Sequence, residues 1–463
     1  MAKRIPRLPG LPILGNLLEF KRDRLGTYLR AAREVGEVAE LRIGPLRAVV
    51  LSAPEHMQTI LVDHGYDFVK NIFYHYLRRA LGLGLVTSEG QLHKRQRKLV
   101  APLLQHRRIA SYAETMVRFG ELVQAQWREG EEIDAQHQMM RITLGIVGKT
   151  LFDAEVLDEA DEIGPALAEV NRYTGTEIGR IVHLPMWWPT PRISRARRAL
   201  RRLDQTIYRL IRERRASGQD AGDILSMLLM AQEENGEGMT DVQIRDEVMT
   251  IFAAGHETTA VALTWTSYLL CRHPGAYRRL QAECDAVLGG RAPTIEDLPQ
   301  LPYALQVFKE AMRLYPPVYA VGRQPLADFQ LGEYLLPRGG TLILNIYAIH
   351  RRPDLYPNPE RFDPDRFEQG REKNLPRHAY LPFGAGPRVC IGNHFALMEG
   401  QLLLALLAQY VTFELTNPDA APVPDPLITL RTRHGIRMRV HRRIPARDRI
   451  GSSMPEAAVR GGR

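Results

Sequence analysis

Apolar residues recur with a helical period along most of the chain, whereas strand-like alternation is confined to short stretches. Residues 37–52 alternate around Gly44-Pro45 and predict a β-hairpin, and residues 329–345 predict another about Arg338-Gly339-Gly340. The pattern therefore predicts a mainly α fold with a small β-rich subdomain. The main helical stretches are residues 111–215 with a break at 183–192, residues 240–271, and residues 393–410.

The longest helical signal begins with a capping box. Thr240 is followed three residues later by Gln243, so a helix is predicted over residues 240–271. Its middle reads AAGHETTA, in which Glu257 and Thr258 place a carboxylate and a hydroxyl at adjacent positions beside a glycine. Glycine and threonine are mildly unfavourable inside a helix, and this favours a functional reason for the motif.

The bulk of the sequence indicates a single unit. The 463 residues contain no Ser/Gly-rich linker, repeat or low-complexity tract, so we predict one domain over residues 1–463. Residues 1–15 are a proline-rich lead-in, and residues 441–463 carry few apolar side chains and are predicted to be a mobile tail. Apolar residues make up 44% of the chain, enough for a core that encloses a large cofactor.

Charge and cysteine content narrow the partners and the compartment. The net charge is +9, but the basic residues are spread out and no nucleic-acid-binding module is recognisable, so an acidic protein is the better partner. The longest apolar run, residues 402–411, is too short to span a bilayer, and the N-terminus lacks the apolar region of a signal peptide. No transmembrane anchor is predicted. Three cysteines cannot all pair, which suits a reducing cytoplasm.

The stretch FGAGPRVCIG, residues 383–392, carries the main candidate chemistry. Cys390 lies between glycines just before an apolar helical run, where backbone N–H groups and a helix N-terminus favour a thiolate. Gly386 and Gly392 are expected to let the chain approach something large and flat, and Arg388 offers a cation to an anionic group. The structural alternative is a buried cysteine in a turn.

The spacing of Phe383, Gly386, Arg388, Cys390 and Gly392 resembles the haem-binding loop of the cytochrome P-450 superfamily. The resemblance extends over about residues 6–440. It implies the cytochrome P-450 fold around haem b (iron protoporphyrin IX), with Cys390 as the axial ligand.

Such a protein is a haem-thiolate monooxygenase that inserts one atom of O2 into a small lipophilic substrate by hydroxylation or epoxidation. Its electrons would come from a separate ferredoxin or flavodoxin and the reductase of that partner. The alternatives are an electron-independent haem-thiolate enzyme, such as a peroxygenase or isomerase, and a haem-based carrier or sensor.

The resemblance also assigns roles along the chain. Glu257 and Thr258 match the acid and alcohol pair of oxygen activation, which argues for the monooxygenase. Arg97 and Arg323 match arginines that bind haem propionates. His93 stands where the family usually has tryptophan, and a neighbouring propionate is expected to raise its pKa. Glu310, Arg313 and Arg361 match a structural Glu-Arg-Arg triad. The pocket candidates, each with core packing as its alternative, are Phe73, Tyr74, Tyr76, Leu83, Phe252, Ala254, Val318 and Val321.

Two surface features remain. The segment MWWPTP predicts a turn with two tryptophans that are either exposed or pocket-lining, and RISRARRALRRL follows as a basic helix face. A solvated surface is the more common explanation of such a face, and membrane contact is the alternative. A second basic group is expected near the haem-binding loop on the side of the electron donor: Lys94, Arg95, Lys98, Arg107 and Arg108.

Overall fold

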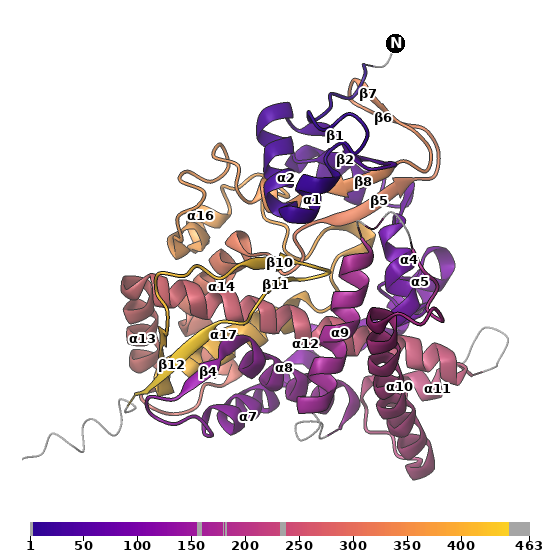
Figure 1. Ribbon diagram of the computed structural model, residues 1–463. Coiled ribbons are helices and arrows are strands. Elements are labelled where there is room, and N and C mark those ends of the chain that lie inside the picture. Colours follow the sequence, from indigo (N-terminus) through magenta and orange to yellow (C-terminus); the bar gives the residue numbers. More distant parts are fainter. Residues whose placement is uncertain (1–2, 155–159, 179, 181–182, 232–237, 444–463) are drawn as a thin grey trace, which may run out of the picture.

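The computed structural model describes residues 3–154, 160–178, 180, 183–231 and 238–443. A sheet with short helices forms one end of the molecule and long helices form the rest (Figure 1). The mainly α fold with a small β-rich part is therefore confirmed. Most of the predicted tail, residues 444–463, lies outside the described residues. Within the described chain, no helix combines the length and the apolar character needed to cross a membrane.

The helices are α1 (Leu17–Arg22), α2 (Arg24–Arg30), α3 (Pro54–Met57), α4 (Phe73–Leu81), α5 (Gly90–Val100), α6 (His106–Ala110), α7 (Ala113–Gln124), α8 (Ala135–Phe152), α9 (Ala160–Glu177), α10 (Pro191–Ser217), α11 (Ile224–Met230), α12 (Asp241–Arg272), α13 (Pro274–Leu288), α14 (Pro302–Leu314), α15 (Ile346–Ile349), α16 (Gln369–Glu372) and α17 (Asn393–Tyr410). Short 3₁₀ or π-helical turns are η1 (Ala31–Val35), η2 (Gln58–Asp63), η3 (Ala101–Leu104), η4 (Ile295–Gln300), η5 (Pro364–Phe367) and η6 (Gly386–Arg388).

The strands are β1 (Val38–Ile43), β2 (Leu46–Leu51), β3 (Phe68–Val69), β4 (Glu132–Asp134), β5 (Val321–Pro325), β6 (Phe329–Leu331), β7 (Tyr334–Leu336), β8 (Thr341–Leu344), β9 (Val411–Leu415), β10 (Pro424–Pro426), β11 (Leu430–Thr432) and β12 (Arg437–Arg442). The largest sheet has the order β1-β2-β8-β5-β3. The smaller sheets are β4-β12-β9, β10-β11 and β6-β7.

One predicted hairpin is confirmed and the other is wrong. Strands β1 and β2 pair antiparallel, with Glu40 opposite Val49, around the predicted turn. Residues 329–345 do not form one hairpin, because β6 pairs only with β7 and β8 lies between β2 and β5 in the main sheet. All four residues of β8 are buried. A strand covered on both faces belongs in the centre of a sheet, which a two-stranded hairpin cannot offer.

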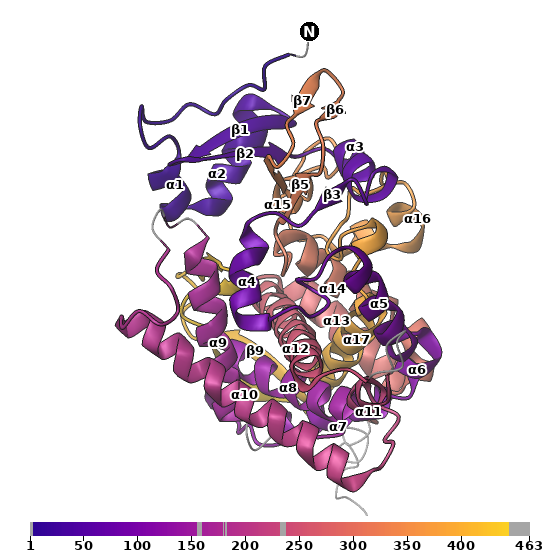
Figure 2. The ribbon, with the colours of Figure 1, turned by 90° about the vertical axis from the view of Figure 1, so that its right-hand side faces the viewer.

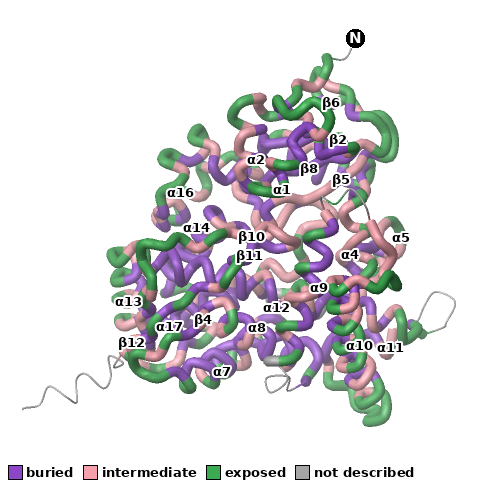
Figure 3. The backbone as a smooth tube through the Cα atoms, in the orientation of Figure 1, coloured by how far each residue is buried: buried purple, intermediate pink, exposed green. Residues whose placement is uncertain are grey.

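Helix α12 crosses the middle of the molecule (Figure 2). The predicted capping box is present, since Gln243 N–H donates to the Thr240 hydroxyl over 3.3 Å and Thr240 N–H donates to Gln243 Oε1 over 2.7 Å. The helix packs against α8, α10, α14 and α17. Most of its side chains are buried, so it forms the axis of the largest apolar core (Figure 3).

Candidate functional site

Cys390 lies in a tight loop that ends at the N-terminus of α17. Cys390 N–H donates to Phe383 O over 2.9 Å and closes the loop. Residue Cys390 is exposed, yet protein atoms crowd round its thiol, and this burial raises the pKa of the thiol, while the Gly392 N–H and Arg97 lower it. Binding a metal cation there would stabilise the thiolate.

The two glycines of the loop have different roles. Gly386 has φ +70°, and a Cβ atom there would lie 1.7 Å from Leu61 O, so glycine is required by packing of the loop on η2. This corrects the expectation that Gly386 makes room for a large group. A Cβ atom added at Gly392 would meet no atom within 4 Å, so this glycine borders open space, and its role in admitting a large flat group stays a prediction. The loop is therefore open on the side of Cys390 and Gly392.

Basic side chains gather beside this loop around one carboxylate. Arg388 donates from Nη2 to Glu89 Oε2 over 2.5 Å and from Nη1 to Gly65 O over 2.6 Å, while its buried Nε has no hydrogen-bond partner among the residues that the structure describes. Arg97 donates to Val389 O over 2.9 Å and ties α5 to the loop. Arg323 is buried, and its Nη1 donates to Gly322 O over 2.9 Å.

The pKa shifts show that this cluster is short of negative charge. Burial and the neighbouring Arg388 and Arg323 lower the pKa of Lys70 to about 7, although Glu89 opposes the shift. Burial also lowers the pKa of Arg323, and Arg388 contributes to the shift. Uncompensated buried cations are costly unless an anion binds among them.

His93 behaves differently from the sequence-based expectation. Burial, followed by Lys70, Arg388 and Arg97, lowers the pKa of its imidazole to about 4, whereas a raised pKa was expected. Among the described residues, burial and the three cations outweigh Glu89, the carboxylate that opposes the shift, and the expected rise next to a haem propionate stays a prediction. His93 is therefore neutral at pH 7 in the described protein.

These features fit haem. The open side of the Cys390 loop offers a thiolate ligand, and the cluster of Lys70, Arg97, Arg323 and Arg388 offers excess positive charge and a free buried N–H to two propionates. Lys70 was not identified from the sequence. It lies outside the quoted motifs, and a single lysine after a two-residue strand carries no recognisable signal.

Glu257 and Thr258 point to different sides of α12. Thr258 is half-buried, donates to Ala254 O over 2.9 Å, and forms an accessible strip with the exposed Ala254. Glu257 is buried and receives hydrogen bonds from Asn171 and, over 2.6 Å, from the Thr429 hydroxyl. Its Oε1 also lies 3.0 Å from Arg431 Nε. Sequence reasoning missed these three partners.

The pocket candidates separate into groups. Phe252 is buried against Phe152, with ring centroids 5.5 Å apart, so it is a core residue and not part of the accessible strip. Phe73 packs on the core beneath the sheet. Ala254 and Leu83 are exposed, and Val318 and Val321 are half-buried. Tyr74 lies under Lys70, whose Nζ is 6.0 Å from its ring centroid, and Tyr76 lies 2.8 Å from His183 through a hydrogen bond.

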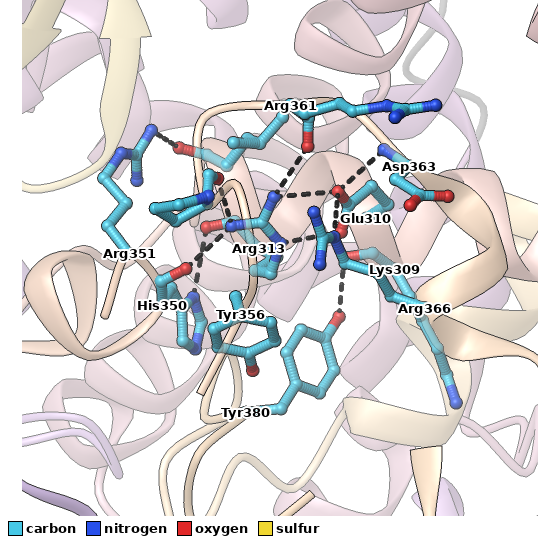
Figure 4. Close-up of polar contacts among 12 residues, drawn as sticks. Lys309, Glu310, Arg313, His350, Arg351, Tyr356, Arg361, Asp363, Arg366 and Tyr380 are labelled. Carbon is cyan, nitrogen blue, oxygen red and sulfur yellow. Dashed lines mark hydrogen bonds and ion pairs between the residues drawn. The ribbon is translucent and has the colours of Figure 1, made fainter. Parts of the chain in front are cut away.

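The expected Glu-Arg-Arg triad has a different third member (Figure 4). Arg313 makes two hydrogen bonds to Glu310, of 2.7 Å and 2.8 Å. Arg361 contributes only its carbonyl oxygen to Arg313, over 3.1 Å, and its side chain is exposed. Arg366 Nε instead lies 3.5 Å from Glu310 Oε1. The assignment of Arg361 is therefore wrong.

The sequence contained the signal for this correction. Pro359-Glu360-Arg361-Phe362 is followed by Pro364-Asp365-Arg366-Phe367, which repeats the Pro-acid-Arg-Phe pattern. The prediction places the triad arginine in the first copy, whereas the second copy forms η5, which packs on α14 and turns its arginine inward.

Comparison with known proteins points in one direction. A family model described as Cytochrome P450 matches residues 6–437. Cyclooctatin synthase of Streptomyces melanosporofaciens is 39% identical over 406 residues, covering 86% of this chain and 87% of that protein. Cyclooctat-9-en-7-ol 5-monooxygenase of the same organism is 36% identical over 407 residues, with the same coverage.

Two further matches cover nearly the whole chain. Pentalenene oxygenase of Streptomyces avermitilis is 34% identical over 441 residues, covering 94% of this chain and 97% of that protein. The crystal structure of the cytochrome P450DA heme domain superposes with a TM-score of 0.85 at 28% identity, covering 96% of this chain and 99% of that one.

Proposed function

Because the chain belongs to the cytochrome P450 family and is a monooxygenase of that family, we propose that it inserts one oxygen atom from O2 into a cyclic terpene hydrocarbon or alcohol. The substrate class rests on the names of its relatives, which specify pentalenene and cyclooctat-9-en-7-ol. Hydroxylation or epoxidation of such a lipophilic molecule needs an apolar pocket with few polar groups. Ala254, Val318, Val321 and Leu83 are the candidates to line it.

The observation that carries the proposal is the exposed Cys390 beside a cluster of under-neutralised cations. Cys390 would bind the iron of haem b through its thiolate, with Phe383 beside it, and Arg97, Arg323 and Arg388, joined by Lys70, would bind the propionates. Bound haem with a thiolate ligand would supply the activation of O2. His93 would add a hydrogen bond from its imidazole at this edge.

The residues of α12 would manage protons. The Thr258 hydroxyl lies on the accessible strip and donates to Ala254 O. It could release this bond and donate instead to a group bound beside α12. Glu257 is held by Arg431, Thr429 and Asn171, so it would deliver protons only when it leaves some of these partners. Arg431 is therefore proposed as a positioning residue for Glu257.

The electrons would come from a separate acidic protein, a ferredoxin or a flavodoxin with its reductase, in the cytoplasm. Lys94 and Lys98 are exposed on α5, the helix that Arg97 ties to the Cys390 loop, and Arg108 follows on α6. The side chain of Arg107 lies outside the described residues. A basic surface near the metal ligand suits an acidic electron donor.

The test uses the purified holoenzyme and a panel of cyclic sesquiterpenes and diterpenes. With a ferredoxin, its reductase and NADPH, at least one panel member is expected to yield a product heavier by one oxygen atom. The reduced protein with carbon monoxide should show the red-shifted thiolate Soret band. Cys390→Ala should lose both signals, and Cys271→Ala, at the C-terminal end of α12, should keep both. A normal band in Cys390→Ala, or turnover with peroxide but never with reductant, would overturn the proposal.

A further inference from the structure

Glu177, the last residue of α9, is a fully buried carboxylate at the centre of a group of basic side chains. Arg192 Nη1 donates to Glu177 Oε1, and His183 Nδ1 lies 3.1 Å from Glu177 Oε2. Arg180 Nε and Arg79 Nη1 approach the same carboxylate over 3.7 Å and 3.9 Å. Three guanidinium groups therefore share one negative charge in the described part of the chain.

Two of these arginines keep unused hydrogen-bond donors. The contacts of Arg79 and Arg180 with Glu177 are longer than hydrogen bonds, and neither guanidinium donates to another acceptor among the residues that the structure describes. Each guanidinium carries five N–H groups in a planar fork that fits the oxygens of a carboxylate or a phosphate. The two side chains are 35% and 42% exposed, so a ligand from solvent can reach them.

A buried hydroxyl in the same group also lacks a partner. The Tyr173 hydroxyl has no hydrogen bond within the described residues, and Arg192 Cζ lies 4.9 Å from the centroid of the Tyr173 ring. His183, by contrast, is satisfied as a neutral imidazole, because Nδ1–H can donate to Glu177 while Nε2 accepts from the Tyr76 hydroxyl over 2.8 Å. Buried polar groups are rarely left unbonded, so an acceptor for the Tyr173 hydroxyl is expected close to Arg192.

The three arginines come from three separate segments of the chain. Arg79 lies on α4, Arg180 follows α9, and Arg192 lies in the first turn of α10. Helix α9 packs against both α4 and α10 (Figure 2). Gathering three guanidinium groups at one point costs Coulomb energy, and the single charge of Glu177 offsets only part of it. A second anion would complete the balance.

We propose that Arg79, Arg180 and Arg192 bind an oxyanion, a carboxylate or a phosphate group, beside Glu177. The unused N–H groups of Arg79 and Arg180 would donate to its oxygens, and Arg192 would add positive charge while it stays bonded to Glu177. The anion would offset the remaining positive charge and would tie α4 to the segment that joins α9 to α10.

Two sources offer this chemistry. One is free inorganic phosphate or diphosphate. The other is the acid group of a cyclic terpenoid, which rests on the proposed function and extends its substrates to acids. Helix α4 carries Arg79 and also the pocket candidates Phe73 and Tyr74. Leu184 and Met186 pack on a small core at the start of α10. An apolar body attached to the anion would therefore find apolar and aromatic side chains beside the arginines.

The test is isothermal titration calorimetry of the full-chain holoenzyme with three probes: inorganic diphosphate, the diterpene abietic acid, and methyl abietate. Diphosphate, abietic acid or both should bind, and the binding should weaken as salt is added, because salt screens the attraction. Arg79→Gln/Arg180→Gln should weaken it at least tenfold. This variant leaves the contacts of Arg192 and His183 with Glu177 in place, so the protein should still fold.

The matched control is Arg172→Gln/Arg195→Gln. It removes the same charge from α9 and α10, but at Glu169, with which both arginines pair, and it should bind the probes like wild type. Glu177→Gln tests the sign of the effect. Removal of the competing negative charge should tighten binding at least threefold, a result that damage to the fold cannot produce.

Abietic acid that binds at least tenfold more tightly than its ester would support the site and identify the terpenoid source. Binding of diphosphate, with acid and ester alike, would support the site and identify the free anion. The proposal would be overturned if diphosphate did not bind and acid and ester bound alike, if Arg79→Gln/Arg180→Gln bound like wild type, or if Glu177→Gln bound no more tightly. Calorimetry needs no turnover, so failure of the proposed monooxygenase activity would leave these results intact.

Discussion

At the scale of single residues, Glu399 is a titratable group buried in the core without the usual partners. It lies on α17, is fully buried, and neither carboxylate oxygen has a hydrogen bond within the described residues. Burial raises its pKa to about 8, and the nearby Thr259 hydroxyl opposes the shift only in part. Glu399 therefore carries a proton at pH 7 in the folded protein.

This proton makes stability depend on pH. The carboxyl has an ordinary pKa of 4.5 in the unfolded chain and about 8 when folded, so the stabilising protonated form is fully present below 4.5. Stability should fall as pH rises from about 4.5 to about 8, by at most about 5 kcal/mol. Glu399→Gln should flatten this slope and be the more stable protein at pH 8. Denaturant unfolding from pH 5 to 8 measures it, with the exposed Glu368→Gln as control. Parallel profiles for Glu399→Gln and wild type would contradict the prediction.

Thr258 gives a second prediction, for catalysis. Its hydroxyl is on the accessible strip of α12, and Thr258→Ala should lower the product formed per reductant about tenfold while reductant is still consumed, with peroxide or water released. Thr258→Ser keeps the hydroxyl and should retain most of the yield. The measurement compares product, peroxide and NADPH. An unchanged yield in Thr258→Ala would transfer the role to the buried Thr259 or to solvent.

The residues that sequence analysis found and missed differ in a physical way. Cys390 and Arg388 lie in one short loop, so their positions in the structure follow from the spacing of residues in the sequence. The partners of Glu257 come from elsewhere, since Asn171 is 86 positions away and Thr429 is 172 positions away. A hydrogen bond between such distant segments depends on how the tertiary fold brings Asn171 of α9 and Thr429, just before β11, to Glu257 of α12. No local pattern encodes that packing.

At the scale of elements, helix boundaries were predicted well where the end is chemically marked. The capping box at Thr240 is a local interaction, and so is the turn between β1 and β2. The prediction for residues 329–345 is wrong because β8 pairs with β5 and with β2, and β2 lies almost 300 positions earlier. Alternation indicates a strand, but it does not say which strand lies next to it.

The junction of α14 with η5 gives a third prediction. Arg366 approaches the fully buried Glu310 and also donates to Pro357 O over 2.6 Å and to Asn358 O over 3.1 Å. Arg366→Gln should therefore cost about 2–4 kcal/mol of stability and reduce bound haem. Arg361→Gln is the matched control and should cost less than about 0.5 kcal/mol. The measurements are denaturant unfolding curves, which give the stability of each variant, and haem absorbance, which gives the amount of bound haem. A larger loss of stability in Arg361→Gln than in Arg366→Gln would contradict the prediction and return Arg361 to the triad.

At the scale of the whole molecule, charge should govern the encounter with the electron donor. Lys94 and Lys98 are exposed, and attraction between exposed charges is screened over about 10 Å at 0.1 M salt. The rate of first electron transfer from ferredoxin should fall steeply with salt, and Lys94→Gln/Lys98→Gln should flatten that dependence. Stopped-flow reduction measures it. A rate that is independent of salt in wild type would contradict the prediction.

The separation of Arg388 from its partners along the chain has a consequence for biosynthesis. Arg388 bonds to Glu89, 299 positions earlier, and to Gly65, 323 positions earlier. At about 5–20 residues per second, a ribosome needs roughly 15–60 s between making Glu89 and making Arg388. During that interval Lys70 and Arg97 belong to a nascent chain in which the Cys390 loop has not yet been made, so the site cannot form. Cofactor capture is then one of the last events of folding, so variants that slow closure should lower the yield of coloured protein in cells more than they lower the stability of the finished enzyme.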